Sequence, residues 1–142
     1  MQALIYPVTD ATTEAPSYET YRDGLLTRER ARWYKGLYTP DPSTRLQPAA
    51  SPLLTPLEAL RRAPPALITL AQCDLLFDEG VAYAERLRAA GVPVEIDVTQ
   101  GVPHAFVSML GLAEGREAVG RVCAWLVRQW GLDGNYAEKR KI

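Results

Sequence analysis

Three short apolar runs alternate with segments of helical spacing along this chain. The runs cover residues 3–6, 66–71 and 94–98. Such runs, bounded by proline, glycine and polar residues, are typical of buried strands, and their alternation with helices predicts a parallel sheet covered by helices. The third run alternates apolar with acidic residues, which predicts one solvated face and a place near the edge of the sheet.

Apolar residues recur at helical spacing in three longer segments. The first covers residues 25–38, with Thr27 as a plausible N-cap. The second begins at Asp78 and ends before Gly91, and the third covers residues 116–130. The apolar stripe of this last helix is predicted to consist of Val119, Val122, Cys123, Leu126 and Trp130.

The remaining segments are predicted to be connections. Residues 39–56 carry prolines at positions 40, 42, 48 and 52, which predicts a surface loop, and a short helix follows over residues 56–62. We therefore assign residues 1–132 to one domain and the polar residues 133–142 to a frayed tail.

Composition and charge narrow the function classes. The chain has 142 residues, of which 47% are hydrophobic, enough for the core of one domain. A net charge of -1 gives no electrostatic reason to expect a nucleic acid or an anionic membrane surface as partner. We find neither an apolar span of about twenty residues nor a signal-peptide pattern, so no membrane span is predicted.

The cysteines and the histidine argue against a metal centre. Cys73 and Cys123 are widely separated, and His104 is the sole histidine, so we expect no zinc site and no other cofactor. Both cysteines are predicted to be small buried thiols in a reducing compartment, which implies a cytoplasmic location.

Asp74 and His104 are the candidate catalytic residues. Each lies just past an apolar run, and about thirty residues separate them, the length of one helical crossover plus a strand. Both are therefore expected at the carboxyl ends of neighbouring parallel strands, where open α/β sheets place their sites. A carboxylate there can hold an imidazole in the tautomer that accepts a proton.

Ordinary structural roles compete with this interpretation. An aspartate after a strand is more often a loop or helix cap, and a lone histidine is more often structural than catalytic. Asp78 competes with Asp74 for the acid role, but it directly precedes the helical stripe and is the better N-cap. A nucleophile is missing, because no Gly-x-Ser-x-Gly turn surrounds any serine of this chain: Ser17, Ser43, Ser51 and Ser108.

Several motifs resemble those of one enzyme family. The chain is similar to the C-terminal half of the hormone-sensitive-lipase-like branch of the α/β-hydrolases, bacterial carboxylesterases and lipases with a Gly-Asp-Ser-Ala-Gly nucleophile motif. The matching stretches are residues 4–10, 50–53, 64–68, 74–80, 83–94 and 104–106. The resemblance implies a partial α/β-hydrolase fold, with about three parallel strands, the last strands of the sheet, and flanking helices.

The resemblance also assigns roles to residues. Asp74 matches the family's catalytic acid and His104 its catalytic base. Residues 25–38 match a helix that helps to wall the acyl pocket. Candidate substrate contacts are therefore Trp33, Tyr34 and Tyr38, together with Phe106 beside the histidine, although ordinary helix packing would explain the first three equally well.

The chain departs from the family pattern beside both candidate residues. Leu75 replaces the proline of the family's Asp-Pro-Leu, and Ala105 replaces the glycine of its His-Gly-Phe. A β-carbon at Ala105 is expected to tilt the imidazole or narrow the pocket. The family's oxyanion-hole motif and serine elbow would lie upstream of residue 1, so the chain alone is expected to be inactive, and a small acyl ester would bind only when the missing half is supplied.

Two alternatives remain open. The chain could be a non-catalytic remnant that acts as a binding or structural module, forming a homo-oligomer through the exposed edge of its first strand. A flavodoxin-like or nucleotide-binding domain is disfavoured, because residues 7–10, Pro-Val-Thr-Asp, stand where a glycine-rich turn would be needed.

Overall fold

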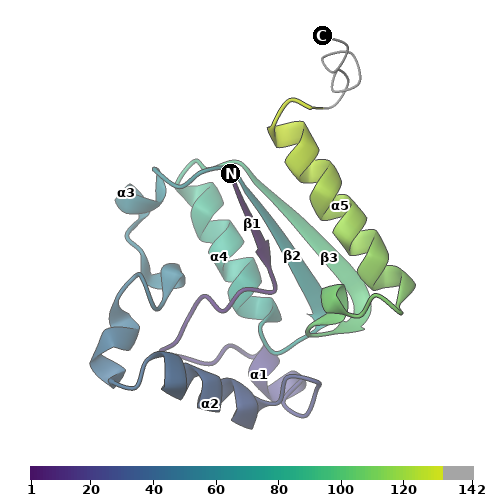
Figure 1. The fold of residues 1–142 in the computed structure, drawn as a ribbon. Helices are drawn as coiled ribbons and strands as arrows, with labels where there is room; N and C mark the ends of the chain where they lie inside the picture. Colours follow the sequence, from purple (N-terminus) through teal and green to yellow (C-terminus); the bar gives the residue numbers. More distant parts are fainter. Residues whose placement is uncertain (133–142) are drawn as a thin grey trace.

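The predicted strands form one parallel sheet. The structure is a computed structural model, of which residues 1–132 are described. Strand β2 (Ala66–Cys73) lies between β1 (Gln2–Ile5) and β3 (Val94–Pro103), and helices lie on both sides of the sheet (Figure 1). This confirms the α/β fold class. The tail predicted over 133–142 lies outside the described residues.

The two faces of β2 are buried under different helices. Ile68 and Leu70 point to one face and pack with α4 (Phe77–Ala89). Leu67 points to the opposite face and packs with α5 (Ala113–Gln129). Since alternate residues of a strand face opposite sides, the unbroken apolar run over 66–71 follows from burial on both faces.

Strand β3 extends five residues further than the apolar run indicated. Ala71 pairs with Thr99, but Cys73 pairs with Pro103, so β3 carries two more residues than β2 over this interval. Gly101 lies in this bulge with a φ of 70°, a conformation that glycine adopts without strain. The bulge restores the pairing at Pro103, one residue before His104.

The segment between β1 and β2 contains a single-turn helix α1 (Ser17–Thr20), then α2 (Arg28–Tyr38), and a final turn α3 (Leu57–Leu60). It first passes the end of the sheet where the strands end, at α1 and α2, and then returns to α3, beside the end where the strands begin (Figure 1). Thr27 is the N-cap of α2, because its side chain accepts a hydrogen bond from the Arg30 N–H. The predicted loop over 39–56 contains two short 3-10 helices, η1 (Pro42–Leu46) and η2 (Pro52–Leu54), which begin at the prolines.

The inner stripe of α5 differs from the prediction. Trp125 is 2% exposed, whereas Trp130 is 60% exposed. The buried residues of α5 are Gly115, Ala118, Val122 and Trp125. Apolar residues surround most of this helix, so the sequence pattern did not fix its rotation. Cys123 is consequently exposed and Cys73 only half-buried, so the prediction of two buried thiols was wrong. No helix within residues 1–132 is long and apolar enough to span a membrane.

Candidate active site

Asp74 and His104 contact each other where β2 and β3 end. The Asp74 Oδ2 atom lies 2.7 Å from Nδ1 of His104. Because Cys73 and Pro103 are paired in the sheet, the residues that follow them leave it side by side. Asp74 is 2% exposed, while the His104 side chain is 21% exposed, so the acid is enclosed and the imidazole is reachable from solvent.

A backbone N–H group also orients the Asp74 carboxylate. Its second oxygen, Oδ1, accepts a hydrogen bond from the Leu76 N–H at 3.0 Å. Each carboxylate oxygen therefore has one partner, and rotation of the group would break both contacts. With Oδ2 as acceptor, Nδ1 of His104 carries the proton, which leaves Nε2 as the nitrogen that can accept one.

Asp78 serves a different purpose. It lies in the first turn of α4 rather than at its N-cap, which is Leu76, so the predicted cap was wrong. Its carboxylate accepts a hydrogen bond from the Ser17 N–H at 2.8 Å. Asp78 thus fastens α1 to α4, and of the two competing aspartates Asp74 is the one that contacts the imidazole.

Ala105 adopts a left-handed conformation directly after the histidine. Its φ is 67°, in the region where a β-carbon is unfavourable and glycine is preferred. Such a residue stores about 1–3 kcal/mol of backbone strain. His104 nevertheless keeps its short contact with Asp74. The β-carbon of Ala105 therefore strains the backbone, while the contact between His104 and Asp74 is retained.

The predicted substrate contacts fall into two groups. Tyr34 and Tyr38 line an apolar cavity of about 340 Å³ between α2, η2 and the start of α4. Trp33 does not line it and packs beside Tyr34, with ring centroids 5.0 Å apart. Phe106 is fully buried in a core cluster with Ala71 and Ala118. The structure therefore brings two of the four residues to a cavity.

This cavity is joined to the acid through Leu76. The Leu76 side chain is among the lining residues, and its N–H donates to Asp74. Tyr38, which also lines the cavity, is 74% exposed. The cavity is therefore bounded in part by the turn that holds Asp74, and its α2 wall includes a residue that is open to solvent.

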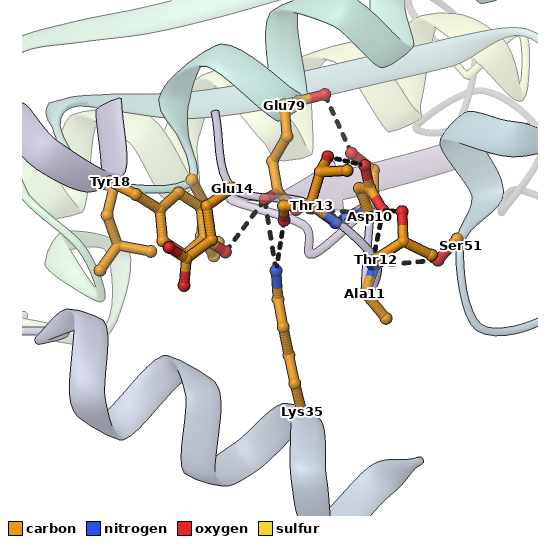
Figure 2. Close-up of polar contacts among 12 residues, drawn as sticks. Asp10, Ala11, Thr12, Thr13, Glu14, Tyr18, Lys35, Ser51 and Glu79 are labelled. Carbon is orange, nitrogen blue, oxygen red and sulfur yellow. Dashed lines mark hydrogen bonds and ion pairs between the residues drawn. The ribbon is translucent and has the colours of Figure 1, made fainter. Parts of the chain in front are cut away.

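A buried carboxylate lies one helical turn from this site. Glu79 is 3% exposed, and its Oε1 accepts hydrogen bonds from the N–H groups of Thr9, at 2.6 Å, and Asp10, at 3.3 Å. Its Oε2 accepts from the Tyr18 hydroxyl at 3.0 Å and lies 3.9 Å from Nζ of Lys35 (Figure 2). One side chain of α4 thereby holds the loop after β1, α1 and α2.

Burial controls the ionisation of this pair. It raises the pKa of the Glu79 carboxyl above the ordinary 4.5, although Lys35 and the N–H donors oppose the shift. It also lowers the pKa of the Lys35 ammonium, although Glu79 opposes this. In the sequence, Glu79 is simply an acidic residue at the start of a predicted helical segment. Its role depends on contacts with residues about seventy positions away, which the local pattern does not reveal.

Within residues 1–132, no group of three or more His, Cys, Asp or Glu side chains is arranged to hold a metal ion. The strand ends present a carboxylate–imidazole pair beside an apolar cavity. Such a pair can move a proton and stabilise the charge that this movement creates.

Comparisons with known proteins identify the class to which this arrangement belongs. The family described as alpha/beta hydrolase fold matches residues 1–108. The ethyl acetate hydrolase of Pseudomonas putida is 43% identical over 115 residues, covering 80% of this chain and 36% of that protein. The chain thus spans about a third of the length of this relative. It belongs to the α/β-hydrolase fold family, and its similarity to carboxylesterases confirms the hormone-sensitive-lipase-like branch.

Solved structures agree with this assignment. One of two fungal esterases from Rhizomucor miehei superposes with a TM-score of 0.86 and 36% identity, covering 95% of this chain and 42% of that one. Carboxyl esterase 2 of Tuber melanosporum gives a TM-score of 0.81 and 32% identity, covering 85% of this chain and 41% of that one.

Proposed function

We propose that this chain supplies the acid and the base of a Ser-Asp-His triad that hydrolyses carboxylic esters. The observation that carries the proposal is the 2.7 Å contact between Asp74 and His104 at adjacent strand ends. Asp74 holds the Nδ1 proton of His104. Nε2 then accepts the proton of a serine hydroxyl as the oxygen attacks the ester carbonyl, and returns it to the leaving alcohol. Water repeats the sequence and releases the acid.

The nucleophile in this proposal comes from a polypeptide segment outside residues 1–142. Two of the serines have their hydroxyls engaged in structural hydrogen bonds: Ser17 donates to the Leu75 carbonyl, and Ser51 donates to the Arg45 carbonyl. Ser43 and Ser108 are exposed, and neither stands in a strand-to-helix elbow. Since loss of a triad serine costs about 10⁶-fold in turnover, the chain alone is expected to be inactive.

The proposed substrate is a small acyl ester. The cavity beside Asp74 is apolar, with aromatic and aliphatic lining, and its volume of about 340 Å³ suits a short chain. The similarity to an ethyl acetate hydrolase supports the same substrate class. Tyr34 and Tyr38 would contact the ester in this arrangement, whereas Phe106 would support His104 from the core.

A chimera tests the proposal. Residues 1–132 replace the matching segment of the Pseudomonas putida ethyl acetate hydrolase, and p-nitrophenyl acetate hydrolysis is measured. The expected result is turnover in the chimera that disappears with His104→Ala, and none in the isolated chain. A folded chimera without turnover would refute the acid–base role. Turnover by the isolated chain that is lost with His104→Ala would refute the external nucleophile.

A second candidate function is a non-catalytic module that associates with a second copy. Among the described strands, β1 is hydrogen-bonded on one side only, to β2, which leaves its other edge open to a further strand. Light scattering after gel filtration distinguishes the candidates. A stable dimer, together with an inactive chimera, would favour the module over the esterase.

A further inference from the structure

Tyr6 is the residue that directly follows β1, just as Asp74 follows β2 and His104 follows β3. Its ring lies against the imidazole of His104, with the centroids 4.5 Å apart and the planes inclined by 57°. The Tyr6 ring also makes an edge-on contact with the ring of Phe106, with the centroids 6.2 Å apart. All three strand ends therefore contribute a side chain to one cluster.

The backbone at Tyr6 is strained in a way that directs this ring. Its φ is 37°, which is rare for a bulky side chain and marks a conformation imposed by its surroundings. The Tyr6 N–H donates to the Thr69 carbonyl at 2.7 Å, so the strained residue is fixed to β2. Strain held at a residue that contacts a reactive group is a recognised sign of preorganisation.

The two contacts of His104 restrict different motions. The bond to Asp74 fixes the position of Nδ1 but leaves the ring able to swing about that atom. A flat side chain packed against the imidazole blocks this swing. We propose that Tyr6 is a positioning residue that clamps the His104 imidazole through its ring. The inference rests on the proposed function only in naming His104 as the base.

The sole histidine of the chain makes the clamp measurable without turnover. In the full chain, nitrogen NMR of the single imidazole at one fixed pH reports its tautomer and the solvent exchange of its Nδ1 proton. Tyr6→Phe retains the ring and is expected to match the wild type. Tyr6→Leu and Tyr6→Gly are expected to accelerate exchange by up to about tenfold, the factor that loss of one aromatic ring contact can contribute.

Comparing the Tyr6 variants distinguishes the effect of the ring from the effect of the strained backbone. Glycine tolerates the positive φ, so Tyr6→Gly removes the ring and relieves the strain at once. Wild-type exchange in both Tyr6→Gly and Tyr6→Leu would overturn the proposal, and so would accelerated exchange in Tyr6→Phe. Tyr83→Leu removes another buried aromatic, from the core under α4, and is expected to lower the melting temperature with unchanged exchange. An equal acceleration in Tyr83→Leu would also overturn the proposal, because the effect would then be global.

The chimera separates this inference from the proposed function. There, Tyr6→Leu is expected to lower kcat by about tenfold or more with little change in KM, because misplacement of a base affects the chemical step. Accelerated exchange in the Tyr6 variants, together with a chimera that shows no turnover, would support the positioning role of Tyr6 and refute the proposed esterase function. A chimera that turns over, together with unchanged exchange in both Tyr6→Leu and Tyr6→Gly, would support the esterase function and refute the positioning role of Tyr6.

Discussion

Lys35 and Glu79 form a buried ion pair that connects α2 to the first turn of α4, with Nζ 3.9 Å from Oε2. The Glu79 carboxylate also accepts a hydrogen bond from the Tyr18 hydroxyl, and the Lys35 ammonium lies 4.7 Å from the centre of the Tyr18 ring (Figure 2). Since α2 carries the two tyrosines that line the cavity, this pair holds the cavity wall against the start of α4. The electrostatics of the pair therefore bear on the stability of the site.

The stability contribution of Glu79 is expected to depend on pH. Because burial raises the pKa of Glu79, folding favours its protonated form. Its contribution is thus fully present below the ordinary value of 4.5 and is lost as the pH rises through the folded-state pKa. The free energy of unfolding of the wild type, relative to Glu79→Gln, should therefore rise as the pH falls from neutral toward 4.5. Urea unfolding at several pH values measures it, and a pH-independent difference would contradict the expectation.

Replacing the cation should weaken the same connection. Lys35→Met leaves Glu79 without its positive partner in a buried site, which costs about 3 kcal/mol, the lower end for a broken buried pair, because the two groups are not in close contact. Arg61→Met, which breaks the exposed pair with Glu58, serves as the matched control. Exposed pairs contribute about 0–1 kcal/mol, so similar losses in both variants by urea unfolding would refute the role of burial.

The two aspartates of the Asp74–Asp78 segment should behave differently in the chimera. Asp74→Asn removes the charge that holds the Nδ1 proton, and loss of this group in a triad costs about 10⁴-fold in kcat. Asp78→Asn alters a contact to the Ser17 N–H instead and should leave most turnover intact. Ester hydrolysis and imidazole NMR check both variants. A larger loss in Asp78→Asn than in Asp74→Asn would reverse the assignment of the acid.

Ala105→Gly should stabilise the protein. Relief of the left-handed penalty gains about 1–2 kcal/mol, and the added freedom of the unfolded chain removes about half of it. The expected net gain is therefore about 0.5–1 kcal/mol in the free energy of unfolding. Ala124→Gly, at an exposed position inside α5, is the control and should lose about 1 kcal/mol. A loss in Ala105→Gly would show that the φ of 67° carries no strain.

Two glycines of α5 should respond oppositely to alanine. A β-carbon at Gly115 would lie 2.5 Å from the Phe106 carbonyl oxygen and 2.9 Å from that of Met109, so Gly115→Ala should cost about 1–3 kcal/mol by displacing the segment after His104. At Gly120 nothing lies within 4 Å, and Gly120→Ala should gain up to about 1 kcal/mol from helix propensity. Equal melting temperatures for the two variants would contradict this contrast.

Local patterns of the sequence predicted the sheet and the meeting of Asp74 with His104, because strand periodicity and crossover length determine both. They could not predict the rotation of α5, since apolar residues on several sides of that helix offered more than one inner face. Nor could they predict the burial of Glu79, which depends on the loop after β1 folding back over α4. The positive φ of Tyr6 likewise follows from tertiary contacts and leaves no mark in a single sequence.

The bulge in β3 has a consequence for how such sites tolerate change in chain length. Between Ala71 and Cys73 the central strand advances by two residues, while β3 advances by four from Thr99 to Pro103. The two extra residues around Gly101 form a bulge, and the pairing that resumes after it places His104 beside Asp74. The number of residues between Asp74 and His104 is therefore an adjustable quantity, because the pairing of Cys73 with Pro103 is what brings the two side chains into contact.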